Sequence, residues 1–135
     1  MSTIELTKAN FHSTITDNGL VLVDFWAAWC GPCQRFAPVY EGVSSEYPDV
    51  VFGKVDTEVE TELADEYGIL SIPTLMIFKD QRRVFERAGA LPESALRSLI
   101  DEAKVFDANR GGSHTIAPPP SRPSVTVPIV GAEHT

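Results

Sequence analysis

Three short runs of β-branched and aromatic residues constrain the fold of this chain most strongly. They are Leu20–Trp26, Val50–Val55 and Thr74–Phe78, and each is almost continuously apolar. Runs of this kind are typical of strands that are covered on both faces of a sheet. Stretches with helical spacing of apolar residues lie between them, which indicates parallel strands joined by right-handed crossovers. The sequence therefore predicts an α/β fold with a central mixed sheet between helices.

Weaker patterns extend this core. We expect a short edge strand at Ile4–Leu6 and, after a polar turn, a strand at Arg83–Arg87 antiparallel to the third central run. Helical spacing places apolar residues at Phe11 and Ile15; at Phe36, Tyr40 and Val43; at Val59, Leu63 and Tyr67; and at Leu96, Leu99, Ile100 and Ala103. Gly68 is a stop signal for the third of these helices, and Pro92 is a start signal for the fourth. We therefore expect about five strands, with about four helices spread over both faces of the sheet.

Length and charge exclude several classes of protein. The 135 residues suit one domain with an ordinary core. A formal net charge of -8 and a pI near 4.7 argue against a nucleic acid or an anionic membrane as the partner. The N-terminal residues lack the profile of a secretory signal, and no apolar run is long enough to cross a bilayer. We therefore expect a cytoplasmic protein, unless a targeting segment preceded Met1.

The composition changes sharply after the last helical pattern. Residues 107–135 hold half of the chain's ten prolines and no aromatic residue, so they cannot build a packed core of their own. We expect a domain over 1–106 and a disordered or extended tail over 107–135. A functionless extension is the favoured interpretation of this tail. Two alternatives stay open, a weak polyproline ligand pattern at Pro120–Pro123 and pairing of Ser124–Val130 with a sheet edge.

The two cysteines, Cys30 and Cys33, follow the first central run and enclose Gly31 and Pro32. A purely structural disulfide between them would close a loop of only about four residues and contribute at most roughly 2 kcal/mol. A zinc site would need further ligands, and two of the three histidines lie in the tail. Neither a staple nor a metal site is therefore the favoured interpretation of this pair.

The position of the pair favours thiol–disulfide exchange instead. Residues three apart lie on one face of a helix, so Cys33 can reach Cys30 with little backbone movement. Pro32 suits the first helical turn, where an N–H has no helical acceptor. Cys30 would then face the unpaired N–H groups and the positive end of the helix dipole, which stabilise a thiolate. We therefore expect Cys30 to be the exposed, attacking sulfur and Cys33 to lie deeper.

Several further elements occur at set distances from the cysteines. They are VDFWAAWCGPC at Val23–Cys33, Pro38, KVD at Lys54–Asp56, SIPT at Ser71–Thr74, and Gly89 after the last predicted strand. With these elements, the chain resembles the thioredoxin family between Ile4 and Phe106. The resemblance implies a thioredoxin fold and a protein-disulfide reductase, in which Cys30 attacks a client disulfide and Cys33 resolves the mixed disulfide. Gln81 departs from the family, which commonly has glycine at this turn position, and this puts the turn geometry in question.

The resemblance also implies roles for the residues around the cysteines. Asp24 would exchange a proton with Cys33, and Lys54 would tune Asp24; a carboxyl group in an apolar strand needs either a partner or a proton. The residues that would bind substrate are Trp29, Gly31, Pro32, Ile72, Pro73, Ala88 and Gly89. Pro73 would follow a cis peptide bond, which only proline makes at low cost.

The partners follow from the same resemblance. The chain would meet disulfide-containing client proteins and would be re-reduced by a separate thioredoxin reductase that uses NADPH. It would be a monomer with no bound cofactor, no metal, and no nucleic-acid or membrane partner. Two alternatives remain: a disulfide oxidase or isomerase, and a non-catalytic binding subunit that uses the same surface.

Overall fold

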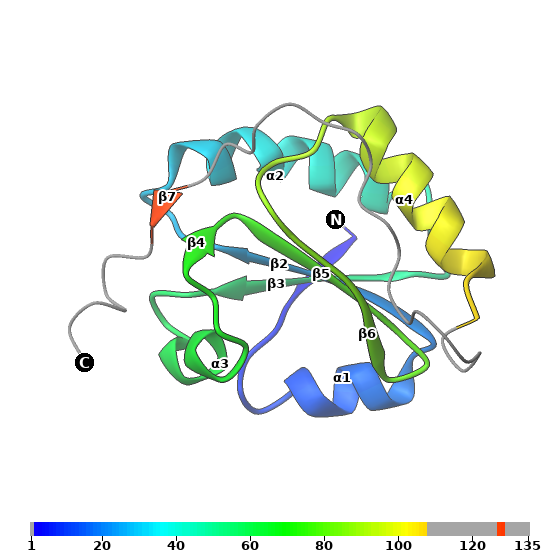
Figure 1. Cartoon of the computed structure of the whole chain (residues 1–135), viewed down its shortest axis with the longest axis horizontal. Coiled ribbons are helices and arrows are strands. Elements are labelled where there is room, and N and C mark those ends of the chain that lie inside the picture. The colour runs from blue at the N-terminus through cyan, green and yellow to red at the C-terminus, as the bar shows by residue number, and fades with distance from the viewer. Residues whose placement is uncertain (1, 108–126, 129–135) are drawn as a thin grey trace.

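The strand β2 (Leu20–Trp26) lies at the centre of a mixed five-stranded sheet (Figure 1). The computed structural model describes residues 2–107 together with 127 and 128. The strand order is β1-β3-β2-β5-β6, where β1 is Thr3–Glu5, β3 is Val51–Asp56, β5 is Thr74–Lys79 and β6 is Arg82–Ala88. Strands β1, β3 and β2 run parallel to one another. Strand β5 is antiparallel to β2, and β6 is antiparallel to β5. The predicted mixed sheet and its three central runs are confirmed.

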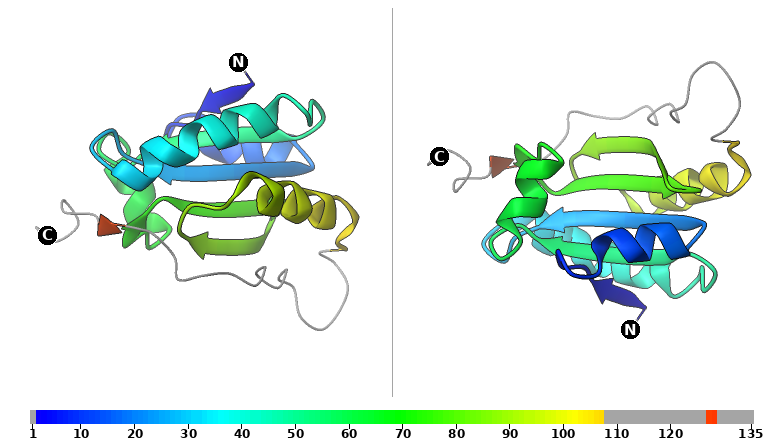
Figure 2. Two further views of the ribbon diagram at one scale, coloured as in Figure 1. Left: turned by 90° about the horizontal axis from the view of Figure 1, so that it is seen from above. Right: turned by 90° about the horizontal axis from the view of Figure 1, so that it is seen from below.

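Four helices cover this sheet within the described residues. They are α1 (Phe11–Asp17), α2 (Gly31–Ser44), α3 (Thr61–Glu66) and α4 (Glu93–Val105). Helices α2 and α4 pack on one face of the sheet, and α1 and α3 on the other, as the two opposite views in Figure 2 show. The prediction of helices on both faces is therefore confirmed.

The side chains of β2 explain why its sequence is almost continuously apolar. Leu20 and Leu22 belong to the core under α2 and α4, whereas Val21, Val23 and Phe25 belong to the core under α1 and α3. Successive side chains of a strand point to opposite faces, so a strand buried on both faces needs apolar residues at almost every position. Asp24 is the exception, and it lies in the same strand just before the cysteine loop.

Two of the expected helix starts are wrong. Val59 was expected in the third helix, but α3 begins at Thr61 and Val59 is 66% exposed. The carboxylate of Asp56 accepts from the Glu58 N–H at 2.9 Å, and its carbonyl accepts from the N–H groups of Val59 and Glu60. This turn holds Val59 outside the helix. Pro92 is expected in the first turn of the fourth helix. The structure instead has Pro92 as the N-cap of α4, and the helix itself begins at the next residue, Glu93.

The hairpin turn between β5 and β6 keeps its geometry without glycine. Asp80 and Gln81 both have positive φ, 50° and 73°. A two-residue hairpin turn of type I′ has positive φ at both central positions, which matches the twist of the flanking strands. Gln81 therefore adopts a backbone conformation that costs a non-glycine residue about 1 kcal/mol.

Candidate active site

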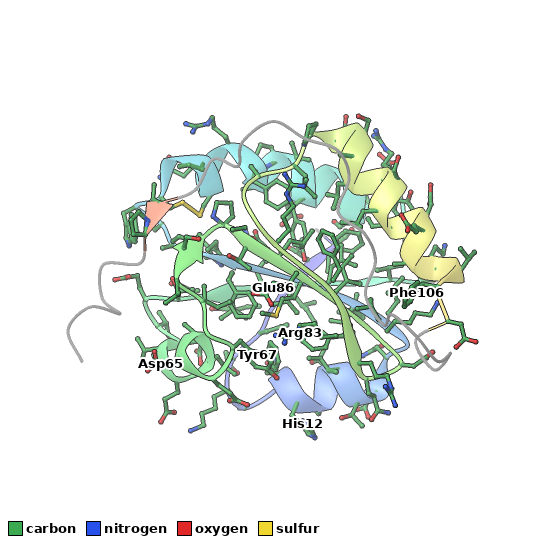
Figure 3. The ribbon with its side chains drawn as sticks, viewed as in Figure 1. His12, Asp65, Tyr67, Arg83, Glu86 and Phe106 are labelled. Carbon is green, nitrogen blue, oxygen red and sulfur yellow. A yellow bond between two sulfur atoms is a disulfide. The ribbon has the colours of Figure 1, made fainter. Side chains whose placement is uncertain are left out.

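The loop after β2 delivers both cysteines to the start of α2. Cys30 is the N-cap of this helix, Gly31 is its first residue, and Pro32 occupies the first turn, where its missing N–H costs nothing. Cys30 and Cys33 are joined as a disulfide, with their Cα atoms 5.2 Å apart (Figure 3). The structure therefore shows the oxidised form of the pair.

One backbone donor contacts the sulfur of Cys30, and another contacts its carbonyl oxygen. The N–H of Cys33 donates to Cys30 Sγ at 3.1 Å, and the N–H of Gln34 donates to the Cys30 carbonyl at 3.0 Å. The start of a helix also carries a partial positive charge from its aligned peptide dipoles. A sulfur that accepts from a backbone N–H at this position is stabilised as a thiolate when the disulfide is opened.

A second segment lies against this sulfur. The short strand β4 (Ser71–Ile72) precedes a cis peptide bond between Ile72 and Pro73, as the sequence predicted. Cys30 Sγ lies 3.8 Å from the Ile72 carbonyl oxygen. The backbone N–H of Gly89, which has a positive φ of 112°, donates to the Pro73 carbonyl at 2.8 Å. The structure thus places Ile72 beside Cys30 and Gly89 against the neighbouring Pro73.

The remaining candidates for substrate binding differ in exposure. Trp29 is 45% exposed, which leaves its ring free to meet another molecule. Gly31 and Ala88 are half-buried, whereas Pro32, Pro73 and Gly89 are buried.

The expectation that Cys30 is exposed is wrong for this oxidised structure, because Cys30 has no exposed surface and Cys33 is only 3% exposed. A segment of the predicted tail packs against the apolar cluster that contains these cysteines. Val127 and Pro128 form the strand β7, which pairs with β4 in antiparallel fashion and lies beside it in Figure 1. Val127 packs against the apolar cluster that contains Cys30, Cys33 and Ile72.

The sequence offers the pairing of β7 with β4 only as an alternative, in which Ser124–Val130 pairs with an unspecified sheet edge. It gives no link between this segment and the cysteines. The available signal was the short alternation at 125–129, where apolar side chains are separated by Thr126 and Pro128. The rest of that stretch, the Pro120–Pro123 pattern and the expectation of a disordered or extended tail lie outside the described residues, apart from Val127 and Pro128.

Asp24 is buried in β2, with 1% of its surface exposed. Burial raises the pKa of Asp24 to about 7, against an opposing effect of the Lys54 charge, which lowers it. Lys54 is the register partner of Asp24 on β3. Its Nζ lies 4.8 Å from the centre of the Trp26 ring, a cation–π contact that holds the charge near the strand end. Asp24 can therefore gain or lose a proton near neutral pH.

The described residues contain no group of three or more His, Cys, Asp or Glu side chains that could hold a metal ion. No helix among them is both long enough and apolar enough to cross a bilayer.

A disulfide at a helix start, with a cis-proline loop against one sulfur and a mixed sheet behind it, defines a thiol–disulfide oxidoreductase. Comparison with known proteins agrees with this class. The thioredoxin family model matches residues 2–102. The chain therefore belongs to the thioredoxin family, and the resemblance noted in the sequence is confirmed.

Individual relatives support the same assignment. A curated relative from Streptomyces coelicolor, which carries a provisional thioredoxin name, is 59% identical over 106 residues, covering 78% of this chain and 79% of its own. The thioredoxin of Porphyra purpurea is 45% identical over 104 residues, or 76% of this chain and 97% of its own. Among solved structures, a mutant thioredoxin from Halobacterium salinarum superposes with a TM-score of 0.70 at 35% identity, covering 78% of this chain and 92% of its own.

Proposed function

We propose that this chain is a protein-disulfide reductase that acts by reversible dithiol–disulfide exchange at Cys30 and Cys33. The observation that carries the proposal is the place of Cys30 Sγ, between the Cys33 N–H at 3.1 Å and the Ile72 carbonyl at 3.8 Å. The helix start favours a negative sulfur, and the loop beside it offers backbone groups to an extended client segment.

The exchange proceeds in two steps. The Cys30 thiolate attacks one sulfur of a client disulfide, so that a mixed disulfide forms and the other client sulfur leaves as a thiolate. The Cys33 thiolate then attacks Cys30 Sγ, which closes the Cys30–Cys33 disulfide and releases the second client sulfur. Two electrons pass from the dithiol to the client.

Asp24 serves the second step as the group that accepts the proton of Cys33 and returns it in the reverse direction. Its pKa, raised by burial to about 7 against the lowering effect of Lys54, suits proton transfer near neutral pH. Lys54 acts as a positioning residue that tunes Asp24 through its charge.

Client binding is assigned to Trp29, Gly31, Pro32, Ile72, Pro73, Ala88 and Gly89. Exposed apolar surface at Trp29 suits protein docking, and the Ile72–Pro73 loop suits strand addition. The support for grouping these residues is the 3.8 Å distance from the Ile72 carbonyl oxygen to Cys30 Sγ and the bond from the Gly89 N–H to the Pro73 carbonyl.

The cellular setting is part of the same proposal. A separate NADPH-dependent thioredoxin reductase restores the dithiol, and the chain itself needs no bound cofactor or metal. It acts as a cytoplasmic monomer on disulfide-containing client proteins, without a nucleic-acid or membrane partner. The catalytic domain spans 1–106, and 107–135 is a separate tail.

Reduction of insulin disulfides by dithiothreitol tests the activity. The purified chain should accelerate insulin precipitation well above dithiothreitol alone, and Cys30→Ser should return the rate to that background. Equal rates for the wild type and Cys30→Ser would contradict the catalytic role. A measured reduction potential near that of strong disulfide oxidants, about -120 mV, would favour an oxidase instead.

A further inference from the structure

We propose that the C-terminal strand β7 is a built-in ligand of the client-binding loop, which a client segment must displace from β4 before it reaches Cys30. The inference rests on the proposed function, because it assumes that clients pair with β4. It assigns an occupant to that strand, namely this chain's own segment at Val127–Pro128.

The pairing register places β7 directly on the proposed client site. Val127 lies opposite Ile72, and Pro128 lies opposite Ser71. The carbonyl of the same Ile72 lies 3.8 Å from Cys30 Sγ. An extended client that adds a strand to β4 needs the backbone positions that β7 already occupies, so the two are mutually exclusive.

The side chains of β7 fit this position in the way that strand geometry requires. Successive residues of a strand point to opposite sides. Val127 is half-buried and packs against the cluster that contains Cys30 and Cys33, whereas Pro128 is exposed. A proline has no N–H for a further strand, so its place at an outer edge is a natural end to the pairing.

The pairing of β7 with β4 indicates which kind of client segment fits beside β4. It is extended, and it carries a β-branched apolar residue opposite Ile72 and a side chain facing solvent at the next position. A charged residue in place of Val127 would bury its charge against an apolar cluster without a partner, which is costly. We therefore expect clients to present an uncharged segment of this type beside their disulfide.

The covalent link makes even a weak contact effective. The chain between Asp107 and Val127 can extend to roughly 70 Å, several times the radius of gyration of about 13 Å of a 100-residue domain. A tethered segment acts at an effective concentration on the order of 1 mM. If the segment alone bound with a Kd of about 0.1 mM, the covered form would exceed the open form roughly tenfold.

The decisive variant is Val127→Asp in the full chain. Two measurements are made on it: the rate at which dithiothreitol reduces the oxidised Cys30–Cys33 pair, followed by tryptophan fluorescence, and the KM for insulin. We expect the reduction rate to rise and the KM to fall, each by about tenfold, because the open form becomes dominant. Rates and KM values within twofold of the wild type would overturn the inference.

Two control variants separate packing from charge. Val127→Ile keeps a β-branched apolar residue opposite Ile72 and should behave as the wild type. Pro128→Asp adds the same charge at an exposed position and should also leave the reduction rate close to that of the wild type. Equal acceleration by Pro128→Asp and Val127→Asp would show that charge alone acts, which would contradict displacement of a packed strand.

A dilution series distinguishes the chain's own segment from that of a second copy. An intramolecular contact gives a reduction rate that is independent of protein concentration, whereas a rate that rises on dilution would assign the segment to another molecule and overturn the proposal. Failure of the proposed function looks different. In that case neither the wild type nor Val127→Asp would accelerate insulin reduction, although the reduction rates of their own disulfides would still differ.

Discussion

Asp24 on β2 lies opposite Lys54 on β3, yet the Lys54 amine lies over the Trp26 ring, 4.8 Å from its centre. Within the described residues, Asp24 Oδ1 has no hydrogen-bond partner. A buried carboxyl group without a close partner is more stable with its proton than without it. The Lys54 charge therefore moderates the effect of burial on Asp24 and does not cancel it.

The contribution of Asp24 to stability should fall as the pH rises from about 4 to about 7. Burial raises the pKa of Asp24 from 3.8 to about 7, so the folded form holds a proton that the unfolded form has already lost. Stability from this group is fully present below about pH 4 and is lost progressively as the pH rises from about 4 to about 7, by roughly 4 kcal/mol in all. Urea unfolding of the oxidised protein at a series of pH values measures this.

Asp24→Asn is the matched variant for that series. It keeps the shape of the carboxyl group but cannot ionise, so the decrease between about pH 4 and pH 8 should be absent. The variant should therefore be more stable than the wild type at about pH 8 and close to it at about pH 4. Parallel pH profiles for the two proteins would show that Asp24 does not titrate in this range.

Removal of the Lys54 charge should raise the pKa of Asp24 further. Burial and Lys54 act on this carboxyl group in opposite directions, and Lys54→Met leaves burial alone. A carbon-13 NMR titration of the Asp24 carboxyl group should show a midpoint at higher pH than in the wild type. Lys54→Arg retains the positive charge and should leave the midpoint nearly unchanged. The same midpoint in all three proteins would show that the charge of Lys54 does not affect the pKa of Asp24.

Much of this site could be predicted from local sequence. The part that could not be predicted depends on contacts between residues that are distant in the chain. The apolar runs located β2, β3 and β5, because strands buried on both faces have few alternatives. The Cys-Gly-Pro-Cys stretch located the start of α2, because proline suits a first helical turn. Val59 matched a helical spacing by coincidence, since the hydrogen bonds to Asp56 decide where α3 begins.

The burial of Cys30 could not be predicted in the same way. The apolar cluster that contains Cys30 also contacts Val127 of β7, a strand of only two residues that lies far along the chain from both Cys30 and β4. A pair of residues carries no periodic signal, and its pairing depends on the free edge of β4 and on the apolar cluster behind it. The pairing alternative at Ser124–Val130 was visible in the sequence, but its partner strand was not.

Glycine at position 81 should stabilise the hairpin between β5 and β6. Gln81 has a φ of 73°, a conformation that glycine adopts without strain. Gln81→Gly should therefore raise the free energy of unfolding by about 1 kcal/mol, measured by urea denaturation. Gln81→Ala removes the same side chain, with its weak contact to the Thr16 carbonyl at 3.5 Å, but keeps the strain. A gain equal to that of Gln81→Gly would show that the side chain, and not φ, is responsible.

Gly53 on β3 should not tolerate a side chain. A Cβ at this position would lie 2.3 Å from Leu6 Cδ1 and 2.8 Å from Leu6 Cγ, and Leu6 is completely buried. Gly53→Ala should lower the free energy of unfolding by about 1 to 3 kcal/mol, as overpacked cores do. Gly42→Ala in α2 is the control, because no atom lies within 4 Å and alanine favours a helix, so stability should rise slightly. Equal effects of the two substitutions would contradict the packing argument.

The central claim is that the sulfur of Cys30, and not that of Cys33, forms the bond with a client protein. The variants Cys33→Ser and Cys30→Ser each keep one thiol, and each can be incubated with oxidised insulin, quenched with acid and measured by mass spectrometry. We predict that Cys33→Ser accumulates the mixed disulfide at Cys30 at least about tenfold faster than Cys30→Ser does at Cys33. Equal rates, or faster reaction at Cys33, would contradict the account.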